Sequence, residues 1–277
     1  MAVDLHIHST ASDGTLTPRE ILSAASELNL SAIAIADHDD LTGTVEASEL
    51  AQDSGQLVIP AVEISTDYKQ TEVHILGYWV DRQSATLQEQ LAHIREGRIL
   101  RAARIVERLS EIGVSISLDQ VLVKAAGGSV GRPHVAQTLV EAGECATGHE
   151  AFARYLGRHA PAYIPRVRPS TLEAIEMISE SGGCPVLAHP GLVRGQPRAV
   201  FDMKDLGIQG VEAYHPKHGR GQIKTFLSQT RRCGLLVTGG SDSHGPGGTR
   251  PVPIGAGDVP DSCAEELISW RKRHQSR

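Results

Sequence analysis

The chain has few aromatic residues and no long apolar run. Phe, Trp and Tyr make up 4% of its 277 residues, and no stretch approaches the roughly 20 apolar residues that a membrane-spanning helix needs. No basic segment followed by an apolar one opens the chain, which argues against a secretory signal. No apolar stripe suggests a protein interface. We therefore expect a soluble cytoplasmic protein with no membrane association and no stable protein partner.

Cysteine is scarce and widely spaced. The four cysteines lie at least 30 residues apart and form no CxxC pair. This spacing excludes a zinc ribbon and a thioredoxin-like redox motif, and it favours reduced, buried thiols.

Two catalytic motifs are also missing. No GxSxG is present, so a nucleophile elbow finds no support. The glycine-rich stretch "GGSDSHGPGG" lacks the lysine of a P-loop.

Charge is unevenly distributed. The net charge is −6, but residues 95–168 contain 11 Lys and Arg against 7 Asp and Glu. An acidic body with one basic segment is not typical of a protein that coats long nucleic acids. It is compatible with binding a small polyanion.

Short apolar runs recur along the chain and predict buried strands of a largely parallel sheet. Seven such runs occur: "VDLHIH", "AIAIADHDD", "LVIPAVEIS", "EVHILGYWV", "PVLAHPG", "GVEAYHP" and "LLVTGGSDSH". Helical patterns separate most of them. One begins at Thr17, where Pro18 and Glu20 complete a capping box. Repeated strand and helix predict an α/β barrel. The link between residues 64 and 71 is too short for a crossover helix, so the third and fourth strands can pair antiparallel.

A long segment interrupts this alternation. It starts with the helical pattern "TLQEQLAHIREGRILRAARIVERLSEIG" and continues through "GRPHVAQTLVEAG" and "HEAFARYLG". We interpret residues 95–167 as an α-helical insertion that covers one end of the barrel, and residues 1–94 and 168–277 as the barrel.

Every predicted strand has a His, Asp or Glu at or near its C-terminal end. In α/β barrels the active site is built at that end. His6 and His8 are two residues apart, so both point to the same face of a strand while Ile7 points away. Imidazoles and carboxylates together suit Zn, Mn or Fe. Acid/base catalysis by the histidines alone is less economical, because so many charged rings would repel one another unless metals kept them neutral.

Four motifs in this order resemble the PHP phosphoesterases, a family named for polymerase and histidinol phosphatase. The motifs are "HIHSTASDG", "ADHDD", "LAHPG" and "GSDSH". The resemblance implies a distorted (β/α)7 barrel that holds two or three divalent ions at its open end. It implies one ion at His6, His8, Glu63 and Asp242, a second at Glu63, His74 and His189, and a third at Asp13, His38 and His244.

Two further stretches, "SVGRPHVAQTLVEAG" and "AYHPKH", resemble the ribonuclease AM branch, also called the 3',5'-nucleotide bisphosphate phosphatases. This resemblance implies removal of the 3'-phosphate from a bisphosphonucleotide such as pAp. It also implies stepwise 5' to 3' hydrolysis of short oligoribonucleotides.

Substrate contacts are expected outside the metal ligands. Arg132 and His134 of "GRPH" form a plausible anion clamp, because a guanidinium offers a planar fork to phosphate oxygens. Lys217 and His218 can complete a second phosphate pocket. The mechanism we expect is attack on phosphorus by a hydroxide bridging two ions, and His215 can contact the phosphate or protonate the leaving oxygen.

Three alternatives stay open at this point: a histidinol-phosphate phosphatase or other small phosphomonoesterase, a metal-binding regulatory module, and an amidohydrolase. We expect manganese as the metal, although the same ligands accept iron or zinc.

Overall fold

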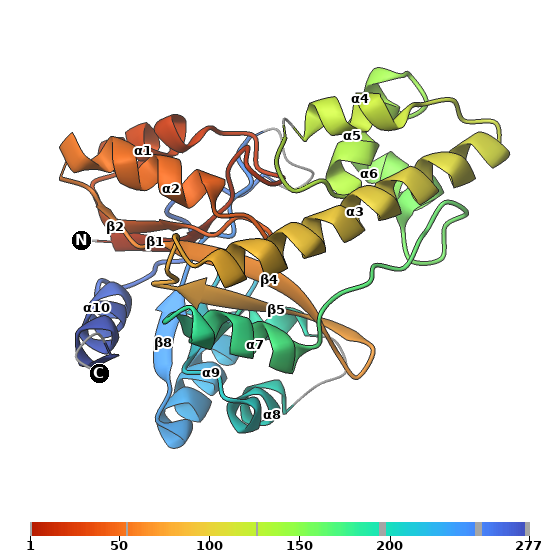
Figure 1. Cartoon of the computed structure of the whole chain (residues 1–277). Coiled ribbons are helices and arrows are strands. Elements are labelled where there is room, and N and C mark those ends of the chain that lie inside the picture. Colours follow the sequence, from red (N-terminus) through yellow and green to blue (C-terminus); the bar gives the residue numbers. More distant parts are fainter. Residues whose placement is uncertain (1, 54, 126, 194–197, 247–250, 275–277) are drawn as a thin grey trace.

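The computed structural model describes residues 2–53, 55–125, 127–193, 198–246 and 251–274. Its strands form two sheets (Figure 1). The smaller sheet is parallel, in the order β1 (Ala2–Ile7), β2 (Leu30–Ile35) and β3 (Leu57–Val58). The larger follows the order β4 (Ala61–Tyr68), β5 (Thr71–Tyr78), β6 (Cys184–Leu187), β7 (Gly210–Tyr214) and β8 (Leu236–Gly239).

The third predicted run is split between the two sheets. β3 and β4 are separated by Ile59 and Pro60, and proline has no backbone N–H to donate to a ladder. The chain therefore leaves the smaller sheet at β3 and enters the larger one at β4.

β4 and β5 pair antiparallel, as the short link predicts. Lys69 and Gln70 both have positive φ, 50° and 65°, as a two-residue type I′ hairpin turn requires. The hairpin extends well past the level of Glu63 and His74. These two residues therefore lie in the first halves of their strands, which corrects the expectation that every site residue lies near a strand's C-terminal end.

The sheets are not closed into one continuous barrel among the described residues. Their edges meet only through single bridges, Ile7 to Ser243 and His38 to Glu63. The (β/α)7 barrel is thus not established, and the observed architecture is an α/β fold with two facing sheets. Both bridges involve a predicted metal ligand or its direct neighbour.

The inner faces of both sheets share one hydrophobic cluster. Alternate residues of β2 and β6 point into it, including Ala34 and Val186. The helix α10 (Ser262–His274) contributes Leu267 and Trp270 to the same cluster. Glu63 and His74 continue this inner face, because they lie two residues from buried Ala61 and Leu76.

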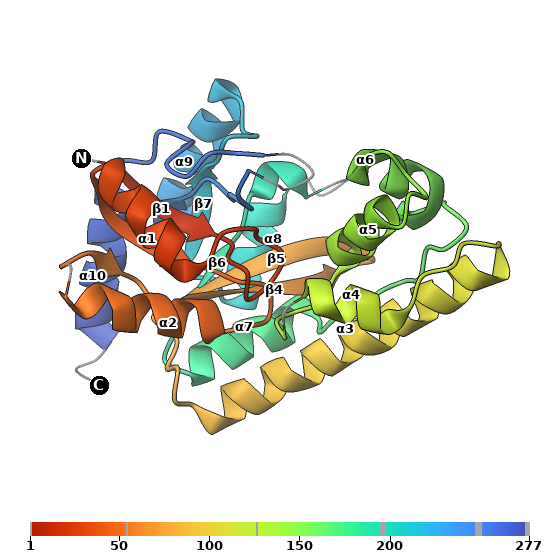
Figure 2. The same cartoon turned by 90° about the horizontal axis from the view of Figure 1, so that it is seen from above.

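Helices cover the outer faces (Figures 1 and 2). Thr17 and Glu20 form the predicted capping box of the first helix. Within the described residues, no helix combines the length and apolar character needed to cross a membrane. The covering helices are α1 (Pro18–Glu27), α2 (Thr42–Leu50) with a 3-10 turn (Ala51–Asp53), α7 (Thr171–Glu180), α8 (Ala199–Leu206) and α9 (Arg220–Cys233).

The remaining helices project from the body as a separate lobe (Figure 1). They are α3 (Ala85–Glu111), α4 (Leu118–Lys124), α5 (Arg132–Glu141) and α6 (Gly148–Ala151), which runs into a π-helical turn (Phe152–Leu156). Apolar side chains between Ala102 and Ile164 form a hydrophobic cluster of their own. The first turns of α3 instead pack on the larger sheet through Leu87 and Leu91, so the boundary expected at residue 95 falls inside a continuous helix.

Candidate metal centre and active site

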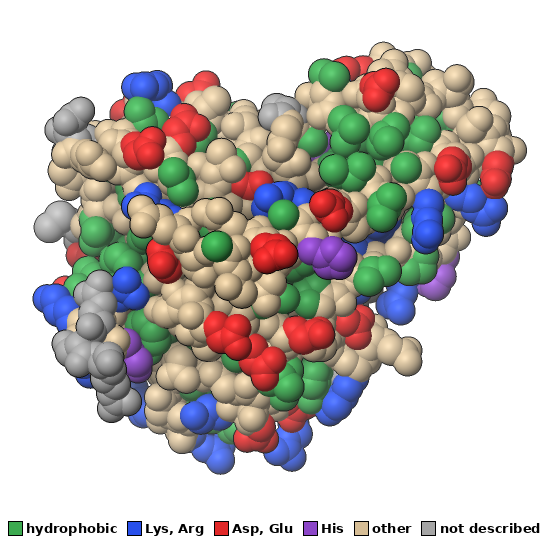
Figure 3. All heavy atoms as spheres, viewed as in Figure 1, with side chains coloured by type: hydrophobic (Ala, Val, Ile, Leu, Met, Phe, Trp, Pro, Cys, Tyr) green, Lys and Arg blue, Asp and Glu red, His purple; other side chains and the backbone are tan. Residues whose placement is uncertain are grey.

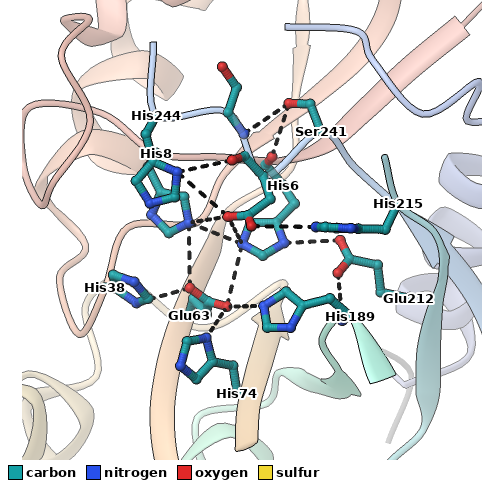
Figure 4. A network of polar contacts seen from close by, with 12 residues as sticks. His6, His8, His38, Glu63, His74, His189, Glu212, His215, Ser241 and His244 are labelled. Atoms are coloured by element: carbon teal, nitrogen blue, oxygen red, sulfur yellow. Dashed lines mark hydrogen bonds and ion pairs between the residues drawn. The ribbon is translucent and has the colours of Figure 1, made fainter. Parts of the chain in front are cut away.

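The nine predicted metal ligands come from both sheets and from the loops that follow their strands, and they lie together. Figure 4 shows how His6, His8, His38, Glu63, His74, His189 and His244 point toward one another. His6 lies in β1 and His8 directly follows this strand, whereas Asp242 and His244 follow β8. Three groups have ligand atoms within 4.8 Å of one another: His8, Asp13, His38 and His244; His6, His8 and Glu63; and His38, Glu63 and His74.

Glu63 lies at the centre of the cluster. Its Oε1 is 2.8 Å from His74 Nδ1 and 3.1 Å from His189 Nε2. Its Oε2 is 2.9 Å from His38 Nδ1 and 3.4 Å from His8 Nε2. A carboxylate between four imidazoles can bridge two cations with its two oxygens.

His8 and His38 belong to more groups than the family resemblance implies. His8 Nε2 lies 3.1 Å from His6 Nε2 and 3.3 Å from Asp242 Oδ1, and its ring stacks on that of His244 with centroids 4.2 Å apart. Ligands that were assigned to separate ions therefore form one continuous cluster.

Several buried polar atoms of this cluster lie close together without forming a well-aligned hydrogen bond. Among the described residues, they include Glu63 Oε2 and His38 Nδ1, which are 2.9 Å apart, and Asp13 Oδ1, which is 3.3 Å from His244 Nε2. Buried polar atoms without a hydrogen bond are rare and costly. Converging imidazole nitrogens and carboxylate oxygens are the donor set that Mn, Fe and Zn accept. The residues present therefore fit divalent cations.

The carboxylates of the cluster are held ionised. Burial alone would raise the pKa of Glu63, but the charges of His74, His38 and His6 hold it well below its usual range. Asp13 and Asp242 behave in the same way, since neighbouring histidines lower their pKa against the effect of burial. Three anionic ligands in one buried space favour binding of cations.

The histidines divide into two kinds. Burial, and then the charge of His244, lower the pKa of His8 to about 3, so its ring is neutral and can bind a metal directly. Burial disfavours charge on His74, yet Glu63 and then Glu72 raise its pKa to about 10. Asp13 and Asp242 likewise raise the pKa of His244 to about 9. In the metal-free protein these two rings supply the positive charge that bound cations would supply.

Asp37, beside His38, shapes the loop that carries Asp13. Its carboxylate accepts hydrogen bonds from the backbone N–H and hydroxyl of Ser9, at 2.8 and 2.6 Å, and from the hydroxyl of Ser12 at 2.5 Å. These bonds fix the loop between β1 and α1, so that Asp13 reaches the His8, His38 and His244 group.

The "GRPH" residues lie at the first turn of α5, near the cluster. Arg132 lines a pocket beside it, donates to the Leu156 carbonyl at 3.1 Å and lies over the rings of Phe152 and Tyr163. His134 is buried, and its Nδ1 accepts the Gly131 N–H at 2.9 Å. As placed, His134 caps its own helix, and Arg132 is the residue of this motif that faces the pocket.

The "HPKH" residues follow β7 on the other side of the cluster. Lys217 Nζ and His215 Nε2 lie 3.3 and 3.4 Å from Asp242 Oδ2. His218 is buried, and both ring nitrogens contact backbone: Nδ1 is 2.9 Å from the Ala213 carbonyl, and Nε2 accepts the Gly191 N–H at 3.1 Å. As placed, the His218 ring has no nitrogen left for a substrate.

Two groups of residues were missed by the sequence reasoning. Glu212 is fully buried beside His6 and His189. The sequence feature that could have identified it is a carboxylate inside the apolar run "GVEAY". The second group consists of arginines from α3 and the segment before α7, which line the pocket together with Arg132: Arg98, Arg101, Arg158, Arg166 and Arg168. Arginine is common on helix surfaces, so sequence position alone did not reveal that these converge.

Comparison with known proteins places these features in a family. Residues 4–138 match the PHP domain. The 5'-3' exoribonuclease Rnm of Salmonella typhimurium is 35% identical over 249 residues, which cover 88% of this chain and 85% of the relative. The 3',5'-nucleoside bisphosphate phosphatase of Chromobacterium violaceum is 33% identical over 94% of this chain and 93% of its own length.

A solved structure agrees with these relatives. A Bifidobacterium adolescentis protein described as a metal-dependent phosphoesterase superposes with a TM-score of 0.88 at 34% identity, covering 96% of this chain and 95% of that one. The motif resemblance is confirmed, and the predicted activity class is that of the relatives. The chain belongs to the PHP-domain family and is a metal-dependent phosphoester hydrolase.

Proposed function

We propose that this phosphoesterase removes the 3'-phosphate from 3',5'-bisphosphonucleotides such as pAp, and that it also hydrolyses short 5'-phosphorylated oligoribonucleotides from the 5' end. The observation that carries the proposal is one pocket of about 610 Å³ that is lined both by metal ligands and by arginines. Asp13, His38, His74 and His189 are the metal ligands that line it. A substrate with two phosphates can place one at the metal ligands and the other at arginines of the same pocket.

The arginines of the pocket differ in whether they pair with a carboxylate. Arg98 and Arg166 pair with Asp39, and Arg168 pairs with Glu72 at 2.8 Å. Among the described residues, Arg101, Arg132 and Arg158 of this pocket form no ion pair.

Arg101 and Arg132 are close enough to influence each other. Burial, and then the charge of Arg132, lower the pKa of Arg101 to about 10. Two neighbouring guanidiniums that form no ion pair of their own favour an anion, and their planar forks suit phosphate oxygens. Phe152 and Tyr163, whose rings lie against Arg132, also line the pocket, and aromatic side chains can stack on a nucleotide base.

The outer surface differs from the pocket. Glu173, Glu176 and Glu180 of α7 are exposed, and acidic side chains gather on this face below α3 (Figure 3). Positive charge concentrated in a pocket of an otherwise acidic protein raises the local concentration of small anions. The same distribution disfavours long nucleic acids lying across the surface.

We further propose that residues 95–167 act as an insertion unit on a distorted (β/α)7 barrel.

The metal ligands of the cluster determine the proposed chemistry. We propose that the site binds two or three divalent ions, with manganese as the preferred metal and iron or zinc as alternatives. These ions would act as Lewis acids and would lower the pKa of a bound water. His6, His8, Asp13, His38, Glu63, His74, His189, Asp242 and His244 would hold them.

Two residues outside the ligand set can assist the leaving oxygen. His215 Nδ1 accepts the Lys217 N–H at 3.1 Å, so a neutral His215 ring carries its proton on Nε2. Nε2 faces Asp242, and the Lys217 ammonium group lies beside it. His215 can therefore donate a hydrogen bond or proton, while Lys217 neutralises phosphate charge.

The proposal is tested with a manganese-loaded enzyme and four substrates: pAp, 3'-AMP, histidinol phosphate and a 5'-phosphorylated trinucleotide. We expect kcat/KM to be highest for pAp. 3'-AMP keeps the scissile phosphate but lacks the second one, so the Arg132→Ala variant should lose turnover of pAp much more than of 3'-AMP. His8→Ala should lose turnover of all four substrates.

Arg154→Ala is the matched control, because Arg154 also lies in the lobe but is exposed and paired with Glu150. It should leave all four rates unchanged. Equal losses for pAp and 3'-AMP in Arg132→Ala would remove the second-phosphate role. Faster turnover of histidinol phosphate than of pAp would replace the proposed substrate.

A further inference from the structure

Glu212 is a buried carboxylate that contacts two of the predicted metal ligands, His6 and His189. It lies on β7 with 0% of its surface exposed. Its Oε1 is 3.0 Å from His6 Nδ1, and its Oε2 accepts the backbone N–H of His189 at 2.7 Å (Figure 4). Both oxygens are therefore used, and neither faces the substrate pocket.

The contact with His6 determines which ring nitrogen faces the cluster. His6 Nε2 lies 3.1 Å from His8 Nε2 and 3.5 Å from Glu63 Oε1, so Nε2 is the atom available to a cation. A neutral imidazole that binds a cation through Nε2 must carry its proton on Nδ1. Glu212 Oε1 is placed to accept that proton's hydrogen bond.

The contact with His189 holds an unusual backbone. His189 has φ 26° and ψ 62°, in the left-handed region that side chains with a Cβ rarely adopt. The short 3-10 turn Pro190–Leu192 follows directly. Glu212 Oε2 satisfies the N–H of this strained residue, and the ring Nε2 of the same residue lies 3.1 Å from Glu63 Oε1.

We propose that Glu212 is a positioning residue that sets the tautomer of His6 and the backbone of His189 together, and so holds two ion sites in register through one side chain. This inference rests on the proposed metal sites but not on the identity of the substrate. A carboxylate on the far nitrogen of a metal-binding histidine also makes the ring a stronger ligand.

Glutamine is the informative replacement at this position. It has nearly the same shape, but its amide offers one acceptor oxygen and one NH₂ group. Two donors, the His6 Nδ1–H and the His189 N–H, would then compete for a single oxygen. One of them must face an NH₂ group in a buried space, where an unmade hydrogen bond is costly.

The test measures metal binding directly. Wild type and Glu212→Gln are stripped of metal and titrated with Mn²⁺ and Zn²⁺, and affinity and stoichiometry are read by calorimetry and elemental analysis. We expect the affinity of Glu212→Gln to fall about 10- to 100-fold. Metal-free melting temperatures are measured alongside, so that a change in the fold is separated from a change in the sites.

Glu266→Gln provides the matched control. Glu266 also accepts one backbone N–H, that of Val237 at 2.9 Å, but it does so from α10, outside the metal ligand set. The Glu266→Gln variant should bind Mn²⁺ and Zn²⁺ as the wild type does. If Glu212→Gln also binds them with wild-type affinity and stoichiometry, the positioning role is wrong.

A measurement on the wild type guards against a variant that fails to fold. Histidine ¹⁵N spectra of the zinc-loaded protein should show His6 protonated at Nδ1 and bound through Nε2, and binding through Nδ1 would overturn the proposal. Failure of the proposed function looks different: weak metal binding by Glu212→Gln together with no pAp turnover by the wild type would leave the role of Glu212 intact.

Discussion

Arg98 and Asp39 form a buried ion pair that ties the helical lobe to the metal centre. Arg98 Nε donates to Asp39 Oδ2 at 2.6 Å, and Arg166 donates to the same oxygen at 2.6 Å. Asp39 directly follows His38 and has φ 54°. Burial alone would raise the pKa of Asp39, but Arg98 and then Arg166 hold it below its usual value. One carboxylate therefore pairs with two guanidiniums, one from near the start and one from near the end of residues 95–167.

Removal of this carboxylate should destabilise the protein more than removal of either arginine. Asp39→Ala leaves two buried guanidiniums without a counter-charge, so we expect a loss of about 3–5 kcal/mol in the free energy of unfolding. Arg98→Ala leaves Asp39 paired with Arg166 and should cost less. Urea unfolding of the metal-free variants measures both. Arg108→Ala, which breaks an exposed pair with Glu111, should change the same free energy by less than ~1 kcal/mol.

An equal effect of Asp39→Ala and Arg98→Ala would contradict the shared-carboxylate arrangement. It would mean that pairing with Arg166 does not stabilise Asp39 after Arg98 is removed.

The residues closest to the chemistry were the most predictable from sequence. His6 and His8 occur as a pair two residues apart in a strand, and His38, His189 and His244 follow apolar runs, so local patterns identify them. The capping box at Thr17 and the antiparallel β4–β5 pair depend on short-range geometry for the same reason.

The supporting residues were not predictable in this way. Asp39, Arg98 and Arg166 are brought together only by the docking of the lobe, and no local pattern distinguishes them from surface charges. Sheet closure also depends on tertiary register, since only single bridges join the two sheets. Strand count and helix order constrain that register weakly.

Metal binding should release protons. In the metal-free protein the pKa of His74 is about 10 and that of His244 about 9, so both rings are protonated at pH 7. A proton must leave before a ring nitrogen can bind a cation. We therefore expect close to one proton released from each ring at pH 7, and an apparent affinity that rises between pH 6 and pH 9.

Calorimetric titrations in buffers of different ionisation enthalpy measure this release. His8 provides an internal contrast, because its pKa of about 3 means that its ring is already neutral. Affinity that stays constant from pH 6 to pH 9, with no proton release, would contradict the assignment of charge in the metal-free cluster.

Close packing at Gly128 should be sensitive to one added methyl group. A Cβ there would lie 2.2 Å from the Ala11 carbonyl oxygen, and the next residue, Ser129, donates its N–H to the same oxygen at 2.9 Å. Gly128→Ala must push the lobe away from the loop that carries Asp13. We expect a loss of about 1–3 kcal/mol in the free energy of unfolding.

Gly97→Ala is the opposite case. Beyond its chain neighbours and the backbone of its own helix, no described atom lies within 4 Å of a Cβ at Gly97, in the middle of α3, and alanine favours a helix interior by about 0.5–1 kcal/mol over glycine. Chemical unfolding should show stabilisation by Gly97→Ala and destabilisation by Gly128→Ala. A common sign for both would mean that the contact between Gly128 and Ala11 does not limit the packing of the lobe.

His134 should make stability depend on pH. Burial lowers its pKa from the ordinary value of 6.5, so the folded protein binds this proton less readily than the unfolded chain. Its contribution to stability is therefore fully present above pH 6.5 and is lost as the pH falls from there through the folded pKa.

In His134→Asn the amide oxygen can still accept the Gly131 N–H, but the side chain no longer titrates. The difference in unfolding free energy between wild type and His134→Asn should shrink from pH 7.5 to pH 5. A constant difference for His134→Asn over this range would show that burial of this ring does not oppose its protonation.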